Sequence, residues 1–127
     1  MDTGIILLGH GSRIPEANES LRLLAGQVRE FLRGVRVQPC YMMRTRPDLL
    51  EGIGMLAEEG LLRIVVIPMF FCSGLHVRRD IPELLEKARE RFPGITLIYG
   101  TNLGADRRIA EIILDRIREV APDVVPQ

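Results

Sequence analysis

Residues 4–9 read Gly4-Ile5-Ile6-Leu7-Leu8-Gly9, a run in which no side chain is polar. Such a run is typical of a strand in a parallel sheet that is covered on both faces. The loop Gly9-His10-Gly11-Ser12-Arg13 then leads into a helical pattern. The chain therefore opens with one strand-helix unit.

Three further strand-helix units follow the first. Their strands are predicted at residues 35–42, 63–70 and 95–99. Pro39 favours a sheet edge for the first of these, and Ile64-Val65-Val66-Ile67 favours a central position for the next. Apolar residues at helical spacing predict the buried faces of the four helices: Leu21, Leu24, Ala25, Val28, Phe31 and Leu32; Leu49, Leu50, Ile53, Leu56 and Ala57; Ile81, Leu84, Leu85, Ala88 and Phe92; and Ile109, Ile112, Ile113, Ile117 and Val120.

Short polar motifs predict where the helices begin. Ser12 can cap the first helix, and Thr45-Arg46-Pro47-Asp48 can cap the second. Asp80-Ile81-Pro82-Glu83 has the form of a capping box with proline in the first turn, so the third helix is expected to begin there. The fourth helix is expected to begin near Asp106.

Alternating strands and helices indicate the α/β class. We expect a single-domain, three-layer sandwich, with a four-stranded, mostly parallel sheet and helices on both faces. A strand order of 2-1-3-4 would place the reversal of winding between the first and third strands, where ligands bind in such sheets. The domain is expected to span residues 1–121, and residues 122–127 to form a C-terminal tail.

Composition excludes several classes of partner. The 17 basic and 17 acidic residues cancel, which does not favour binding to nucleic acid or to an anionic membrane. The longest apolar stretch is too short to cross a bilayer, and no signal peptide is recognisable. Cys40 and Cys72 match no metal or redox spacing, and Cys72 is expected to be a small buried apolar residue. With no P-loop and no GxGxxG pattern, no nucleotide is expected. These features predict a cytoplasmic protein with reduced thiols.

The two histidines are the strongest candidates for function. His10 and His76 are the only ones in the chain, and each is expected in a glycine-containing loop between a strand and a helix. The ordinary alternative is a loop histidine that donates to a backbone carbonyl. Two imidazoles at one sheet edge instead indicate metal binding or proton transfer near neutral pH.

Arginine supplies almost all the positive charge, since Lys87 is the only lysine. A GC-rich genome would explain that bias. However, Arg78 and Arg79 lie near a predicted helix N-terminus, where cations oppose the helix dipole, so an anionic ligand is a candidate explanation. Arginine also binds carboxylates in a bidentate fashion.

Three segments together resemble a known family: Leu8-Gly9-His10-Gly11-Ser12-Arg13, residues 74–82, and Leu103-Gly104-Ala105-Asp106-Arg107-Arg108. They are similar to the short CbiX-type sirohydrochlorin cobaltochelatases, which are class II chelatases, and the similarity covers essentially the whole chain. It implies a chelatase-like fold and a lyase of cobalamin or siroheme biosynthesis that inserts Co²⁺, or else Fe²⁺ or Ni²⁺, into sirohydrochlorin. It also implies that His10 and His76 bind the metal and accept pyrrole protons, and that the enzyme is a homodimer. The expected substrate-binding residues are Ser12, Arg13, Arg44, Arg46, Gly74, Arg78 and Arg79.

One segment departs from the family pattern. Members usually carry a glutamate before the proline that opens the second helix, whereas Met42-Met43-Arg44-Thr45-Arg46-Pro47 contains no carboxylate. Its absence removes a hard oxygen ligand, and arginines repel a cation. A non-catalytic protein that carries metal or tetrapyrrole is therefore the alternative. A phosphatase is disfavoured, because Gly9 stands where the Arg-His-Gly motif of histidine phosphatases has arginine.

Overall fold

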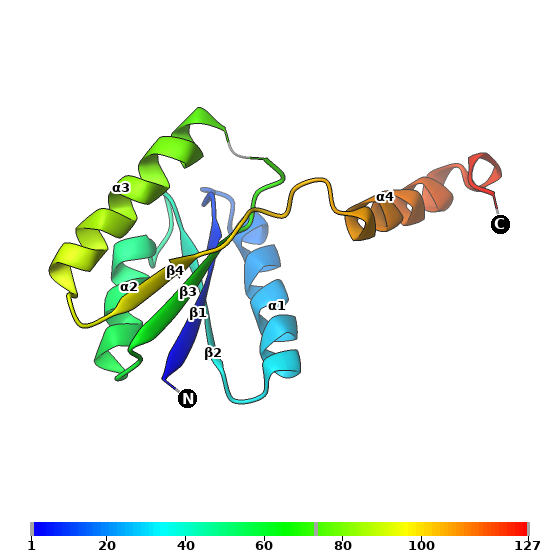
Figure 1. Cartoon of the computed structure of the whole chain (residues 1–127). Helices are drawn as coiled ribbons and strands as arrows, with labels where there is room; N and C mark the ends of the chain where they lie inside the picture. The colour runs from blue at the N-terminus through cyan, green and yellow to red at the C-terminus, as the bar shows by residue number, and fades with distance from the viewer. Residues whose placement is uncertain (1, 73, 127) are drawn as a thin grey trace.

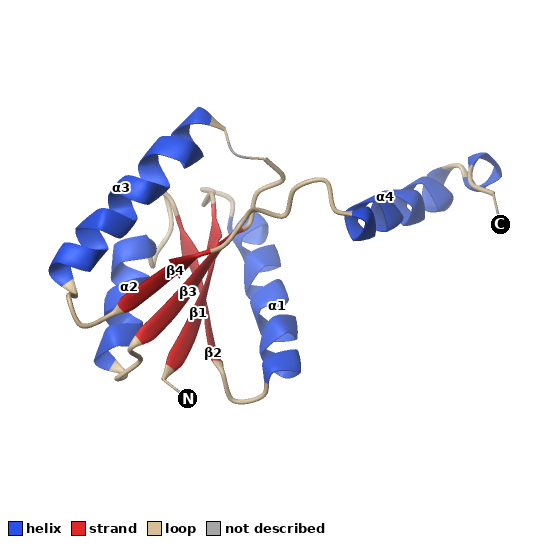
Figure 2. Ribbon diagram, viewed as in Figure 1, coloured by secondary structure: helices blue, strands red, loops and turns tan. Residues whose placement is uncertain are grey.

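Four strand-helix units build the molecule, seen in the computed structural model of Figures 1 and 2. The structure describes residues 2–72 and 74–126, apart from the side chains of residues 75–77. The elements are β1 (Thr3–Gly9), α1 (Pro15–Leu32), β2 (Arg36–Tyr41), α2 (Leu49–Glu58), β3 (Arg63–Pro68), α3 (Leu75–Arg91), β4 (Thr96–Tyr99), α4 (Arg107–Val120) and the 3₁₀ helix η1 (Pro122–Val124).

The four strands form one parallel sheet in the order β2-β1-β3-β4, which confirms the predicted order. Ile6 is paired with Gln38 of β2 on one side and with Val66 of β3 on the other. The strand with Pro39 lies at the edge, and the Ile64–Ile67 run lies inside the sheet, both as expected. The winding therefore reverses between β1 and β3.

The main core lies between the sheet and the pair α2 and α3. Ile6, Ile53, Ile64 and Ile81 are fully buried in it. Helix α2 begins as predicted, because the Asp48 side chain accepts from the Glu51 amide while the Glu51 side chain accepts from the Asp48 amide, a complete capping box. Helices α2 and α3 thus cover this face of the sheet.

Of the helices that the structure describes, only α1 packs on the opposite face of the sheet (Figure 1). Leu21 and Ala25 are buried there, but Leu24, Phe31 and Leu32 are exposed, contrary to the prediction. Helix α1 packs mainly over β2 and β1. Its residues that face away from these strands have no neighbouring helix to cover them in the described part of the chain. The predicted cap is also wrong: Ile14 is the N-cap residue, and Ser12 lies before it.

Helix α3 begins six residues earlier than its sequence motif indicated, since the motif made Asp80 the N-cap. Gly74 is its N-cap, and Pro82 lies inside the helix rather than in its first turn. Proline lacks the amide that would bond to the carbonyl four residues before it, yet Ile81 and Leu85 on either side are buried against the sheet. This tertiary packing keeps the helix continuous through the proline. His76 consequently lies in the first turn of α3 and not in a loop.

Helix α4 differs most from expectation. It projects away from the sheet (Figures 1 and 2), and none of its residues is buried. The apolar face predicted from Ile109, Ile112, Ile113, Ile117 and Val120 exists, but within this chain it covers no core. No helix in the described part of the chain is long and apolar enough to span a membrane.

Candidate functional site

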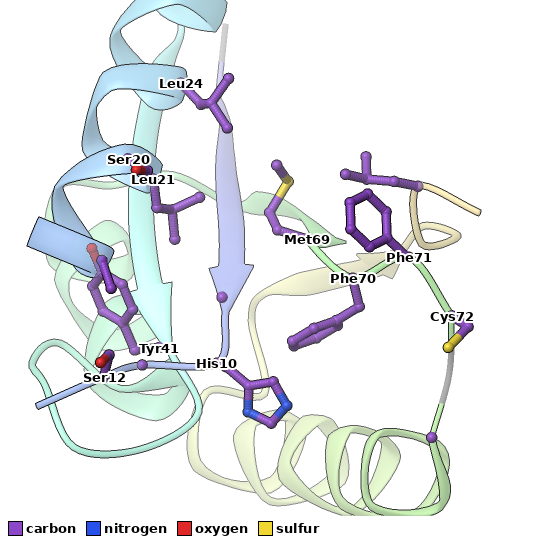
Figure 3. Close-up of a pocket in the computed structure, with 15 residues that line it drawn as sticks. His10, Ser12, Ser20, Leu21, Leu24, Tyr41, Met69, Phe70, Phe71 and Cys72 are labelled. Carbon is purple, nitrogen blue, oxygen red and sulfur yellow. The ribbon is translucent and has the colours of Figure 1, made fainter. Parts of the chain in front are cut away.

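A cavity of about 720 Å³ opens at the carboxyl ends of β1 and β3, where the winding reverses (Figure 3). Ligands bind at this place in open parallel sheets. Its walls are mostly apolar, and they are formed by the loops after β1 and β3, the first turns of α1 and the segment after β4. The lining residues are Gly9, His10, Gly11, Ser12, Ala17, Ser20, Leu21, Leu24, Tyr41, Met69, Phe70, Phe71, Cys72, Gly74 and Leu103.

The loop that carries His10 is fixed by backbone hydrogen bonds. The Met42 amide donates to the Gly9 carbonyl at 2.9 Å, and the Met43 amide donates to the His10 carbonyl at 3.1 Å. Gly11 has φ of +93°, and a Cβ atom there would lie 1.8 Å from the Met43 carbonyl oxygen. Glycine is therefore required at this position, both for its backbone conformation and for the close approach of the neighbouring loop.

Asn18 holds the other end of the loop. Its Oδ1 accepts from the Ser12 amide at 2.9 Å, and its Nδ2 donates to the Ser12 carbonyl at 2.8 Å. The Tyr41 hydroxyl donates to the Asn18 carbonyl at 3.1 Å, so β2 supports the same turn. Asn18 is buried, and sequence reasoning missed it. The available signal was an asparagine one turn before Leu21, on the inward face of a helix.

The His10 imidazole is exposed and lies at the edge of the cavity beside Phe70 (Figure 3). The two ring centroids are 5.1 Å apart, and the planes meet at 77°, an edge-on contact. Such a contact restrains the imidazole ring while leaving it open to the cavity. Its nitrogens can therefore serve as ligands or as proton acceptors.

The His76 side chain lies outside the described residues, so its predicted meeting with His10 stays a prediction. Its backbone follows Gly74, which lines the cavity, by two residues. Among the residues that the structure describes, no three His, Cys, Asp or Glu side chains form a metal-binding group.

Arg44 and Arg46 line a separate pocket of about 420 Å³, formed by the loop between β2 and α2. Arg46 does not stand alone, because its Nε donates to Glu51 Oε2 at 2.8 Å and a second bond joins the same pair. The Arg46 guanidinium, together with the Asp48 amide, lowers the pKa of Glu51. A carboxylate therefore lies beside this loop, supplied from one turn into α2 rather than from the loop itself.

Only some of the remaining predicted substrate-binding residues line the main cavity. Ser12 and Gly74 line the main cavity, whereas Arg13, Arg78 and Arg79 are exposed and are not among its lining residues. Cys72 is exposed and lines the cavity, so its predicted burial is wrong. Cys40 is buried, and burial raises the pKa of its thiol to about 12.

Comparison with known proteins places this chain in a family. The CbiX family model matches residues 4–120. The chain belongs to the CbiX family. The sirohydrochlorin cobaltochelatase of Methanopyrus kandleri is 33% identical over 91% of this chain and 94% of its own length.

Two further relatives bear on the architecture of this CbiX chain. A crystal structure of a CbiX protein of cobalamin biosynthesis from Marinobacter aquaeolei superimposes with a TM-score of 0.79 at 27% identity, covering 92% of this chain and 95% of that one. The sirohydrochlorin ferrochelatase of Priestia megaterium is 29% identical over 94% of this chain but only 45% of its own length. The CbiX fold therefore occurs both as a short chain and as about half of a longer one.

Proposed function

We propose that this CbiX chain is a metal chelatase that inserts Co²⁺ into sirohydrochlorin, with Fe²⁺ and Ni²⁺ as alternative metals. The observation that carries the proposal is the apolar cavity with the His10 imidazole at its edge, at the point where the sheet reverses its winding. A tetrapyrrole is a flat apolar ring, and its metal enters through the ring face. The similarity to the sirohydrochlorin cobaltochelatase of Methanopyrus kandleri, which covers 91% of this chain, supports the same activity.

The reaction needs two things from the protein. The metal must exchange water ligands for the four ring nitrogens, and two pyrrole N–H groups must each lose a proton. A neutral imidazole can ligate Co²⁺ through one nitrogen or accept one of these protons at near-neutral pH. We assign these roles to His10 and His76, so that each metal inserted releases two protons through the two imidazoles.

The ring would lie against the apolar wall formed by Leu21, Met69 and Phe70. Its peripheral carboxylates would then point to the rim, where arginine side chains can bind them by charge-assisted hydrogen bonds. Arg13, Arg44, Arg78 and Arg79 are the exposed candidates. Arg46 contributes less free charge, because Glu51 already pairs with it.

We further propose that the active form is a homodimer. The chain matches about half of the longer ferrochelatase, and two short chains would supply both halves. In that assembly each subunit presents one cavity edge and one His10 loop to the partner.

The test is a spectrophotometric insertion assay with sirohydrochlorin and Co²⁺, Fe²⁺ or Ni²⁺. We expect acceleration over the uncatalysed reaction, and a loss of about 100-fold or more in His10→Ala and in His76→Ala. Gln27→Ala, an exposed change on α1, should retain full rate. Unchanged rates in both histidine variants would remove the assigned roles.

The alternative is a carrier that binds metal or tetrapyrrole without catalysis. The loop before Pro47 has no carboxylate of its own, and the nearby Glu51 is paired with Arg46. Tight binding of sirohydrochlorin with no rate enhancement for any of the three metals would favour the carrier.

A further inference from the structure

The smaller pocket of about 420 Å³, between β2 and α2, adjoins the wall of the main cavity. We call it the arginine pocket, because Arg44 and Arg46 line it together with Met42, Met43, Asp48 and Glu51. Two backbone bonds join its loop to the cavity wall: the Met42 amide donates to the Gly9 carbonyl, and the Met43 amide donates to the His10 carbonyl. A ligand bound against His10 therefore has the arginine pocket next to it.

Arg44 is held in a backbone conformation that arginine rarely adopts. Its φ is +68°, and the Thr45 amide donates to the Met43 carbonyl at 2.9 Å, which closes a three-residue turn around Arg44. The turn is tied to the cavity by the bond of 3.1 Å from the Met43 amide to the His10 carbonyl. Such strain persists where the surrounding structure determines the conformation, and it is common at ligand sites. The turn thus fixes the backbone of Arg44 relative to that of His10.

The Arg44 guanidinium is the cation of this pocket that is available to a ligand. Arg44 is exposed, and none of the ion pairs in the described part of the chain includes it. The two acids of the pocket are engaged at the start of α2, where Asp48 accepts from the Glu51 amide at 2.8 Å and Glu51 accepts from the Asp48 amide at 3.0 Å. The dipole of α2 offsets negative charge at that end of the helix. Arg44 can therefore bind an anion that comes from outside the chain.

Arg46 is paired, but its partner is one that a ligand can replace. Its Nε donates to Glu51 Oε2 at 2.8 Å, and a second bond joins the same two groups. The Arg46 side chain is 85% exposed, and exposed ion pairs contribute little to stability. The two oxygens of Glu51 have separate tasks, since Oε1 completes the helix cap while Oε2 holds Arg46. Arg46 can therefore leave Glu51 for another carboxylate without opening the cap of α2.

We propose that the arginine pocket binds one peripheral carboxylate of the macrocycle, with Arg44 as a constant partner and Arg46 as one that turns from Glu51 to the ligand. The inference rests on the proposed function for the identity of that ligand. Arginine matches a carboxylate in a bidentate fashion. Met42 and Met43 add apolar surface, which suits a carboxylate carried on a methylene arm rather than a free inorganic anion.

The exchange makes Glu51 an internal competitor of the ligand. A ring with a carboxylate at this position replaces Glu51 on Arg46, whereas a ring without one leaves the pair intact and gains nothing from the pocket. The arginine pocket therefore selects carboxylated tetrapyrroles and sets the rotation of the ring over His10.

Titration of metal-free sirohydrochlorin, followed by its fluorescence, measures Kd without any insertion reaction. We expect Kd to rise about tenfold or more in Arg44→Asn, because asparagine tolerates a positive φ and the change removes the charge without disturbing the turn. Arg33→Asn is the matched control: Arg33 is exposed and has a φ of +37°, but it lies at the end of α1 and lines neither pocket. Its Kd should change less than about twofold. Equal changes in the two variants would overturn the assignment of the pocket.

Glu51→Gln tests the exchange itself. The amide oxygen can still accept from the Asp48 amide, whereas the charge that holds Arg46 is lost. We expect Kd to fall about two- to fivefold, the factor by which an exposed ion pair competes, and the fall should vanish in an Arg46→Gln background. An unchanged or higher Kd in Glu51→Gln would overturn the exchange. The methyl ester of sirohydrochlorin should bind the wild type, Arg44→Asn and Glu51→Gln alike, and equal shifts with acid and ester would also count against it.

The insertion assay separates this inference from the proposed function. The predicted changes in Kd without any metal insertion would overturn the chelatase and keep the carboxylate subsite. Insertion by the wild type with an unchanged Kd in Arg44→Asn would do the reverse. A wild-type protein that neither binds sirohydrochlorin nor inserts metal would overturn both.

Discussion

Asn18 joins the first turns of α1 to the loop that carries His10. Its two hydrogen bonds to Ser12 are the only side-chain bonds to this loop from outside it among the described residues. Replacing asparagine with alanine leaves the Ser12 amide and carbonyl without these partners. A buried polar group left without a hydrogen bond costs about 1–3 kcal/mol.

We therefore predict that Asn18→Ala lowers stability by about 1–3 kcal/mol and lowers the insertion rate about tenfold or more, because the His10 loop is no longer held. Denaturant unfolding and the insertion assay measure the two effects. As a positioning residue, Asn18 should affect kcat more than the KM for the tetrapyrrole. A rate that falls only in proportion to the folded fraction would show that Asn18 is merely structural.

At the scale of elements, close packing of α2 on β2 depends on Gly52. A Cβ atom at Gly52 would lie 2.1 Å from the buried Cys40 Sγ, and Cys40 cannot move without disturbing the edge strand. Gly26 in α1 is the matched control, because a Cβ atom there meets nothing within 4 Å.

The two glycines should respond to alanine in opposite directions. We predict that Gly52→Ala destabilises the protein by about 1–3 kcal/mol through overpacking. Gly26→Ala should stabilise it by about 0.5–1 kcal/mol, since alanine favours a helix interior. Chemical denaturation of the two variants measures both, and a stabilising Gly52→Ala would contradict the packing of α2 on β2.

The start of α2 also makes stability depend on pH. Glu51 accepts from Arg46 and from the Asp48 amide, and these contacts lower its pKa in the folded state. A carboxylate with a lowered pKa contributes stability at pH values above its unfolded pKa of about 4.3, and the contribution is lost as the pH falls through the folded pKa.

Acid should therefore destabilise the wild-type protein more than a Glu51→Gln variant between about pH 5 and 3. The difference in urea midpoint between the two proteins is expected to shrink as the pH falls. Because the pair is exposed, high salt should reduce the difference at neutral pH. A difference that is independent of pH would exclude the ionised carboxylate as its cause.

The elements show how far the sequence predicted the structure. Pro39 predicted the edge position of β2, and the Ile64–Ile67 run predicted a central place for β3, because a missing amide and burial on both faces can be read from single segments. The full strand order followed from the winding rule for alternating strands and helices. The start of α3 was mispredicted, since Asp80–Glu83 has the form of a cap, while the real N-cap, Gly74, has no side-chain signal. Asn18 was missed because its partners are backbone atoms of a loop that only the folded chain brings near.

At the scale of the whole molecule, the isoleucine pattern of α4 predicted an apolar face correctly and its partner wrongly. A periodic pattern shows that a helix must bury one side, but it does not state whether the surface belongs to the same chain. In the structure the helix projects away from the sheet, and none of its residues is buried (Figure 1).

Stability should consequently depend on protein concentration. Burying an aliphatic side chain contributes about 1.5–3 kcal/mol, and the exposed isoleucines of α4 would gain this if the proposed homodimer covers them. A tenfold rise in concentration shifts the association free energy by about 1.4 kcal/mol, which should raise Tm by about 2–8 °C. Calorimetry over a hundredfold range of concentration measures this shift.

The variant Ile113→Arg should show a lower Tm with little dependence on protein concentration, whereas Glu111→Arg should behave as the wild type does. A wild-type Tm that is independent of concentration would mean that α4 is not buried by association.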